Sequence, residues 1–98
     1  MHIALAPFRL KDGVTEQALV AASDGFERDF VRRQEGILQR FLVKDGKGGF
    51  ADVVFFSDKE AMTRVVEAEQ NSEACAAFFS IMSADDSHSV FEVIKAYG

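Results

Sequence analysis

The polar residues that could do chemistry are few, and two of them lie in neighbouring apolar segments. Arg40 and Asp52 belong to two strand-like runs, Ile37 to Val43 and Phe50 to Phe56, joined by a glycine-rich loop. A register that places Arg40 opposite Asp52 would form an ion pair inside a largely apolar cavity. The six-residue loop also allows other registers. Arg40 and Asp52 are therefore candidate ligand-binding residues.

His88 and Glu92 form a second candidate pair, four residues apart. Residues four apart on a strand share a face but are separated by about 13 Å, so a bend would be needed for Glu92 to orient His88 as a base. The alternative is a loop histidine and a strand glutamate without a chemical role. Since His88 precedes the last strand in step with Glu92, it can reach the mouth of the cavity, and both residues remain candidates.

The remaining reactive side chains do not form a recognisable site. Cys75 lies on an apolar helical stripe, where a free cysteine usually behaves as a small core residue. The two histidines and the single cysteine are scattered, which does not fit a metal-ligand pattern. We expect no metal and no cofactor, and the sequence assigns no catalytic residue.

Composition limits the class of protein. The chain has 98 residues, ten phenylalanines, no tryptophan and a net charge of −5. Nucleic acid and anionic membrane surfaces are unlikely partners for such a charge, because both require clustered Lys and Arg. Without a signal peptide or a long apolar run, we expect a single cytoplasmic domain over residues 1–98.

The N-terminal half predicts a strand, a helix and a hairpin. His2 to Leu10 reads as a strand followed by a polar turn. Thr15 is placed to cap a helix that ends by Gly36. Its apolar residues recur at helical spacing: Leu19, Ala22, Phe26 and Phe30. Glycines in the loop before Phe50 supply the positive φ angles of a hairpin.

The C-terminal half predicts a second helix and a last strand. The run Ser57 to Glu60 fits a capping box. The apolar stripe that follows extends to Met82 and either continues through Asn71 and Ser72 or breaks there, a break being favoured by these polar residues. A polar connection, residues 83–89, then leads to a strand over residues 90–97.

This order of elements is the ferredoxin-like βαββαβ arrangement of the α+β class. Right-handed crossovers place the first strand between the third and the fourth, with both helices on one face of a four-stranded antiparallel sheet. The third strand is apolar on both faces. We assign Ala51, Val53 and Phe55 to the helix-covered core.

The opposite residues are assigned to the open face of the sheet. This face would hold Asp52 together with Val54, Phe56, Val90 and Ile94. It would exceed the few hundred Å² of contiguous apolar surface that a monomer usually exposes. The predicted partner is a second copy of the chain, giving a homodimer with a cavity at the open face. A small apolar molecule is the expected ligand, and Val54 and Phe56 join the candidate cavity residues.

Four segments resemble a known group of proteins: FRLKDGVTEQALVAASDGFERDFVRRQEGIL, FADVVFF, SEACAAFFSIM and HSVFEV. Together they are similar to small bacterial proteins of the dimeric α+β barrel superfamily, relatives of the antibiotic-biosynthesis monooxygenases. The resemblance covers nearly the whole chain and implies an eight-stranded barrel of two back-to-back sheets. It also implies a cavity in each subunit, between sheet and helices or within the barrel.

The chain departs from this group where its enzymes carry catalytic residues. The monooxygenase and haem-degrading branches are similar in using an Asn with a Trp, but Phe56 stands where similar proteins often carry Trp. Asn71, the only asparagine, lies within the second helical segment and takes no role from the family. A haem-binding histidine would have to be His2 or His88, and neither lies on a convincing helix.

Two functions follow as hypotheses. The first is a homodimeric small-molecule-binding protein, related to cofactor-independent monooxygenases and acting on an apolar, aromatic-sized substrate. Polar residues in the cavity favour it. The alternative is a non-enzymatic dimeric module, stress-related or regulatory, whose cavity is filled by side chains. The large number of phenylalanines favours this alternative.

Overall fold

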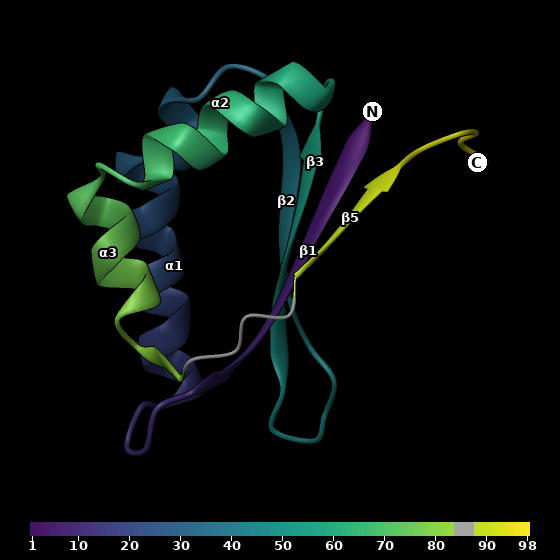
Figure 1. Cartoon of the computed structure of the whole chain (residues 1–98). Coiled ribbons are helices and arrows are strands. Elements are labelled where there is room, and N and C mark those ends of the chain that lie inside the picture. The colour runs from purple at the N-terminus through teal and green to yellow at the C-terminus, as the bar shows by residue number, and fades with distance from the viewer. Residues whose placement is uncertain (84–87) are drawn as a thin grey trace.

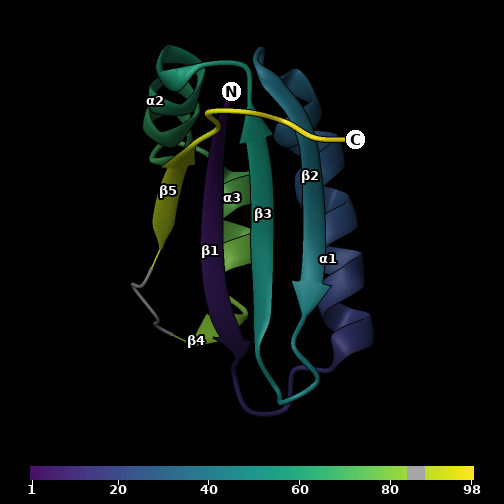
Figure 2. The same cartoon turned by 90° about the vertical axis from the view of Figure 1, so that its right-hand side faces the viewer.

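The computed structural model of the chain describes residues 1–83 and 88–98. Its elements are, in order, β1 (His2–Leu10), α1 (Glu16–Asp29), a 3-10 helix (Val31–Arg33), β2 (Ile37–Lys44), β3 (Phe50–Phe56), α2 (Lys59–Glu69), α3 (Glu73–Phe79), β4 (Met82–Ser83) and β5 (Ser89–Glu92). The three α-helices lie on one side of an antiparallel sheet, and no described helix covers the other side (Figures 1 and 2). The ferredoxin-like α+β fold is confirmed.

The sheet has the predicted strand order. Its sequence in space is β2-β3-β1-β4, and β5 pairs with the same edge of β1 as β4 does. The predicted fourth strand is therefore present as two short pieces. Met82 belongs to β4 and not to the preceding helix, and β5 ends at Glu92, so the prediction of a strand over residues 90–97 is wrong in its extent. The predicted polar connection falls partly on residues 84–87, outside the described residues.

The first helix begins as predicted and ends earlier. The Thr15 side chain accepts a hydrogen bond from the Ala18 N–H at 3.0 Å, which caps α1. The helix ends at Asp29 and is followed by the 3-10 turn. Gly36 lies after that turn, just before β2, with a φ of 91°. Its role is to turn the chain into the strand, and it does not terminate the helix.

The second helical segment is broken, as the polar pair Asn71 and Ser72 predicts. The hydroxyl of Ser72 accepts from the Cys75 N–H at 3.2 Å and caps α3. At the start of α2 the cap is Asp58, whose carboxylate accepts from the Ala61 N–H at 2.8 Å. The predicted capping box that begins at Ser57 is therefore wrong by one residue, because an aspartate at the next position serves as the acceptor.

The two faces of the sheet are exchanged relative to the prediction. Phe56 is 3% exposed and belongs to the core beneath the helices. Strand alternation then places Asp52 and Val54 on the same, helix-covered face. Val90 lies opposite Ala4, which is on this face as well. The open face instead carries a row of residues from four strands: Phe41, Val53, Leu5 and Ser89, followed by Phe55, Ile3 and Phe91.

The exchange has a physical reason. Both faces of β3 are apolar, so periodicity alone does not say which one the helices cover. The prediction placed Asp52 on the open face of the sheet. A carboxylate without a partner would be unfavourable in a monomer core. In the structure Arg40 accompanies Asp52 to the same face, and this pairing allows a carboxylate beneath the helices.

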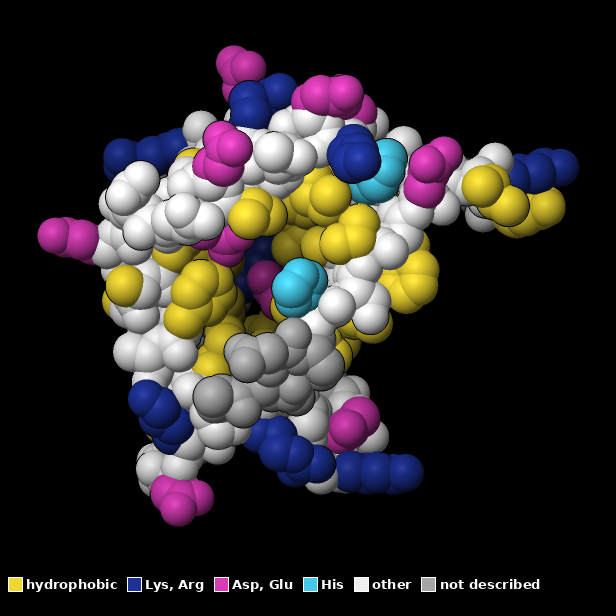
Figure 3. All heavy atoms as spheres, viewed as in Figure 1, with side chains coloured by type: hydrophobic (Ala, Val, Ile, Leu, Met, Phe, Trp, Pro, Cys, Tyr) yellow, Lys and Arg dark blue, Asp and Glu magenta, His cyan; other side chains and the backbone are white. Residues whose placement is uncertain are grey.

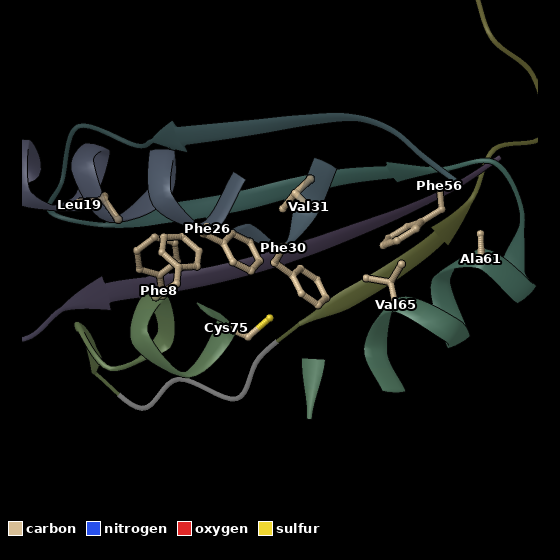
Figure 4. Packing of buried hydrophobic residues seen from close by; sticks show 10 residues of the cluster. Phe8, Leu19, Phe26, Phe30, Val31, Phe56, Ala61, Val65 and Cys75 are labelled. Carbon is tan, nitrogen blue, oxygen red and sulfur yellow. The ribbon is translucent and has the colours of Figure 1, made fainter. Parts of the chain in front are cut away.

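The core is aromatic and extends along the length of the sheet. Phe8, Leu19 and Phe26 lie near one end, Phe56, Ala61 and Val65 near the other, with Phe30 between them (Figure 4). The Phe26 ring stacks on those of Phe30 and Phe78, with centroid distances of 5.5 and 4.5 Å. Such pairs add about 0.5–1.5 kcal/mol each beyond area burial.

Within the described part of the chain, every helix is too short or too polar to cross a membrane.

Candidate functional site

A cavity of about 910 Å³ lies between the sheet and the helices. Figure 3 shows it as a hollow with mostly hydrophobic walls and with charged side chains in its depth. Its walls come from every layer of the fold, including Phe26, Phe30, Val54, Met62 and Phe78. Ligand pockets in proteins are typically about 300–1,000 Å³ and mainly apolar, and this cavity has the size and the lining of such a pocket.

Small residues on the central strand leave this space open. Ala4 and Ala6 of β1 line the cavity, and Ala6 lies opposite Asp52 while Ala4 lies opposite Val54. Two consecutive inward positions of the central strand therefore carry only a methyl group. The buried Phe8 ring, on the same strand, forms part of the cavity wall at one end.

Arg40 is the charged centre of the cavity. Its side chain is only 7% exposed, and its Nε donates to both carboxylate oxygens of Asp52 at 2.8 and 3.1 Å. Nη1 donates to Glu27 at 3.2 Å, and Nη2 donates to the Ser23 hydroxyl at 2.8 Å. Each guanidinium nitrogen therefore has an acceptor, as a buried arginine requires.

Two aromatic rings also contact the Arg40 cation. The Cζ of Arg40 lies 4.9 Å from the ring centroid of Phe26 and 5.4 Å from that of Phe78. A cation within about 6 Å of a ring face is attracted by the ring quadrupole, more strongly where water is excluded. The helices α1 and α3 thus hold the arginine of β2 in place through aromatic contacts as well as hydrogen bonds.

Burial raises the pKa of Asp52, and the guanidinium of Arg40 offsets this only in part. The negative charge of Glu27 acts in the same direction as burial. Two carboxylates share one guanidinium, so the cluster of Arg40, Asp52 and Glu27 carries an excess of negative charge when both acids are ionised.

Glu69 adds a third carboxylate to the cavity region. It lies in the last turn of α2, lines the cavity and forms no ion pair with any residue the structure describes. Burial, together with the charge of Asp52, raises its pKa to about 7. A carboxyl group with such a pKa can accept or release a proton near neutral pH.

Five of the six predicted cavity residues line the observed cavity: Arg40, Asp52, Val54, Phe56 and His88. They are brought together beneath the helices and not at the open face. Arg40 lies opposite Val54, whereas Leu42 lies opposite Asp52. The predicted ion pair is present, but it forms diagonally across the two strands, so the register that motivated it is wrong.

Glu92 lies outside the cavity. Its carboxylate is 72% exposed and approaches His2, with Nε2 and Oε2 separated by 4.0 Å. His88 is exposed at the rim of the cavity. No ion pair joins His88 to Glu92 among the residues the structure describes, so the two are not a base with its orienting acid.

Sequence reasoning missed Glu69, Ser23 and Glu27. A signal for Glu69 existed, since it follows the core residue Val65 by four positions and therefore faces the same way on α2. Ser23 is likewise four positions after Leu19 on the inward face of α1. No comparable signal marks Glu27, which depends on where the long Arg40 side chain reaches.

The described residues contain no cluster of three or more His, Cys, Asp or Glu that could hold a metal ion. Cys75 is fully buried, and burial raises the pKa of its thiol. A thiol in this environment remains protonated and packs as an apolar group.

The fold is similar to that of several solved structures. The cofactor-independent oxygenase SnoaB from Streptomyces nogalater aligns over 97% of this chain and 94% of its own, with 12% identity and a TM-score of 0.76. A candidate antibiotic biosynthesis monooxygenase from Chloroflexus aurantiacus aligns over 99% and 96%, with 16% identity and a TM-score of 0.74. A protein of unknown function from Nitrosomonas europaea aligns over 98% and 91%, with 19% identity and a TM-score of 0.71.

At these identities the similarity shows the fold alone. The resemblance to antibiotic biosynthesis monooxygenase-like proteins is confirmed at that level. Comparison of the sequence with models of protein families and with curated proteins gives no match.

Proposed function

We propose that this protein binds a small apolar molecule of aromatic size in the cavity between its sheet and its helices. The observation that carries the proposal is an apolar cavity of about 910 Å³ with the Arg40–Asp52 ion pair on its wall. Buried charges are costly in a small protein and are commonly found where a ligand is bound or a proton is moved. The volume also disfavours the alternative of a module whose cavity is filled by side chains.

The proposed protein is a homodimer in which the open faces of two sheets pack together. On this face Phe41 is 45% exposed, Val43 43% and Phe91 52%. The rings of Phe41 and Phe55 contact each other edge to face across β2 and β3, with centroids 5.9 Å apart. A second copy is the proposed occupant because an apolar surface that spans four strands matches another such sheet.

The proposed chemistry is a cofactor-independent, monooxygenase-like oxidation of an electron-rich aromatic compound. Support comes from the fold shared with SnoaB, a cofactor-independent oxygenase, and from Glu69, whose pKa near 7 suits proton abstraction. Removing a proton from the substrate in a desolvated pocket makes it easier to oxidise. A non-enzymatic binding protein with the same open cavity, which differs from the filled-cavity module considered above, would lack this chemistry.

Binding is tested with N-phenyl-1-naphthylamine, a neutral dye whose fluorescence increases in an apolar site. The variant Ala4→Phe places a ring in the cavity from β1. We expect it to weaken dye binding by about 10-fold or more, because the ring occupies the ligand volume. The control is Ala21→Phe, which adds the same ring at an exposed position of α1.

Equal dye affinity in the wild type and Ala4→Phe would contradict the proposed site. Circular dichroism and urea unfolding of the three proteins show whether a change in binding results from a loss of folded structure. Loss of binding in Ala21→Phe as well would mean that the dye binds elsewhere.

A further inference from the structure

We infer that the cavity selects ligands whose polar end donates hydrogen bonds, an ammonium or a hydroxyl group, and that it rejects ligands with a carboxylate, sulfonate or phosphate end. This inference rests on the proposed binding function and specifies its ligand class. It follows from the charged groups of the cavity and from how they are already paired.

The single cation deep in the cavity is not free to bind an anion. All three nitrogens of Arg40 donate to protein acceptors, namely Asp52, Glu27 and Ser23. The rings of Phe26 and Phe78 flank the guanidinium carbon. An anionic ligand would have to displace a carboxylate that is already hydrogen-bonded to the arginine, and the displaced carboxylate would be left buried without a partner.

The acceptor groups outnumber this cation. Among the described residues, the cavity lining contains three acidic side chains, Asp52, Glu67 and Glu69, and one arginine. Glu27, which pairs with Nη1 of the same guanidinium, makes the net charge around Arg40 more negative. Glu69 has no cationic partner among the described residues. Glu67 lacks such a partner as well, but it is exposed to solvent, whereas Glu69 is half-buried. Glu69 is therefore the carboxylate within the cavity that is most available to accept a hydrogen bond from a ligand.

Because carboxylates outnumber cations in the cavity, electrostatics favours a ligand that donates hydrogen bonds. The interaction of a unit charge with an unpaired carboxylate a few ångströms away, in a medium of intermediate dielectric, is large enough to change an affinity by about 10-fold or more. The sign of that interaction is favourable for an ammonium group and unfavourable for an anion. A hydroxyl group gains a charge-assisted hydrogen bond without a repulsive charge.

This preference is compatible with the proposed oxidation chemistry. A neutral hydroxylated substrate enters as a donor and transfers its proton to the carboxylate of Glu69. The transfer moves negative charge from the protein to the substrate and leaves the total charge of the cavity unchanged. A substrate that is already an anion would instead add a charge to a negative site.

Three ligands with one naphthalene ring test the inference: 2-naphthylmethylamine, 2-naphthalenemethanol and 2-naphthoate. Their binding to the full-length protein is followed by the fluorescence anisotropy of the naphthalene ring. At about pH 8, where Glu69 is ionised, we expect the amine to bind about 10-fold or more tightly than the carboxylate, with the alcohol between them. Equal binding of the three, or tightest binding of the carboxylate, would overturn the inference.

The same series separates this inference from the proposed function. If none of the three ligands binds, the proposed binding function is wrong. If the alcohol binds to the wild type and the Ala4→Phe substitution weakens its binding, the binding function holds, whatever the relative affinities of the two charged ligands. The charge preference is then decided by the amine and the carboxylate alone.

The variant Glu69→Gln identifies the group responsible. We expect the preference of the amine over the carboxylate to fall by about 5-fold or more, because the amide keeps the shape and removes the charge. The control Glu60→Gln removes one acidic group from the exposed first turn of the same helix, so a purely long-range effect of net charge would appear equally in both variants. An unchanged preference in Glu69→Gln, or the same change in Glu60→Gln, would contradict a local role.

The pH dependence provides a further check. The titratable groups that interact with Glu69 are Asp52 of the sheet and Cys75 of α3, and the other charged or titratable side chains that line the same cavity are Arg40, Glu67 and His88. Between about pH 6 and pH 8 we expect the amine to gain affinity in the wild type as Glu69 ionises, and the gain to be lost in Glu69→Gln. A gain of the same size in Glu69→Gln would assign the effect to another group.

Discussion

Asp52 Oδ1 lies 2.8 Å from Nε of Arg40, although these two residues are not opposite each other in the β2–β3 register. The contact forms because the long arginine side chain reaches diagonally across the sheet, where it also meets Glu27 of α1. Sheet and helix are thus connected by one side chain. Its removal would leave Asp52 without a cationic partner among the described residues and Glu27 with the exposed Arg32 alone, 3.9 Å away.

The first prediction concerns the unequal importance of Arg40 and Asp52 for stability. Arg40→Met should lower the free energy of unfolding by about 3 kcal/mol or more, because the buried Asp52 loses its counter-charge and Glu27 keeps, among the described residues, only the exposed Arg32 at 3.9 Å. Asp52→Asn should cost less, since the arginine keeps Glu27 and Ser23 as acceptors. Urea unfolding at neutral pH measures both. Equal losses for the two variants would show that the cluster is not centred on Arg40.

The second prediction concerns the pH dependence of stability. The pKa of Glu69 is raised from an ordinary value of 4.5 to about 7 in the folded protein. Between these pH values the folded state holds a proton that the unfolded state has released, so this group makes stability fall as pH rises through that window. Above about pH 7 the stability contributed by this group is fully lost. Because Glu69 is partly exposed, we expect a reduced effect of about 1–2 kcal/mol.

Glu69→Gln isolates that contribution. The variant should be more stable than the wild type by this amount at about pH 8 and equally stable near pH 4, since the amide does not ionise. Comparing the two proteins at each pH removes the effect of the other titrating groups. If the difference in unfolding free energy between Glu69→Gln and the wild type were the same at all pH values, it would result from packing and not from titration of Glu69. Glu60→Gln serves as the control with an exposed carboxylate.

The sequence predicted the fold well because its signals are local and agree with one another. Thr15 was predicted as a cap residue and Ser72 as part of a break in the helix. Both act as caps through hydrogen bonds to a residue three positions ahead. The glycine-rich loop likewise carries positive φ angles at Gly46 and Gly48. These features depend on residue type and short spacing, which a sequence displays directly.

The site was predicted in composition but not in place. Asp52, Val54 and Phe56 share a face of β3 by alternation, and Arg40 of β2 lies on the same face because it is opposite Val54 and not, as predicted, opposite Asp52. Which face the helices cover depends on packing between distant segments, and both faces of β3 are apolar. A period of two residues cannot distinguish them. The prediction therefore assigned all four residues to the open face of the sheet, whereas they lie on the face that the helices cover.

The third prediction tests the dimer. Wild-type protein should show twice the chain mass of 10.8 kDa by light scattering on a size-exclusion column. Phe41→Glu should give the monomer mass, because it places a charge from each copy within an apolar interface. In the monomer this position is already 45% exposed, so the substitution should leave the fold intact.

A matched control for the dimer is Val20→Glu, which changes a 47% exposed residue of α1, away from the sheet. It should remain dimeric. A monomeric wild type would reject the dimer, and a dimeric Phe41→Glu would place the interface on another surface.

The fourth prediction separates the enzyme from the non-enzymatic module. In the expected reaction the ring methylene of 1,8-dihydroxyanthrone becomes a carbonyl, one oxygen atom of O₂ enters the product and the other leaves as water. An oxygen electrode should record uptake above the uncatalysed rate without added cofactor. The rate should rise with pH as Glu69, with its pKa of about 7, becomes able to accept a proton.

Glu69→Gln should lower kcat by about 100-fold and abolish this pH dependence, because a positioned proton acceptor typically contributes at least that factor. Its expected stability at about pH 8 excludes unfolding as the cause. Glu60→Gln should retain full activity. If folded, dimeric wild-type protein binds the anthrone without accelerating oxygen uptake, the cavity serves binding alone and the non-enzymatic alternative is favoured. If Glu69→Gln remains as active as the wild type, another group accepts the proton.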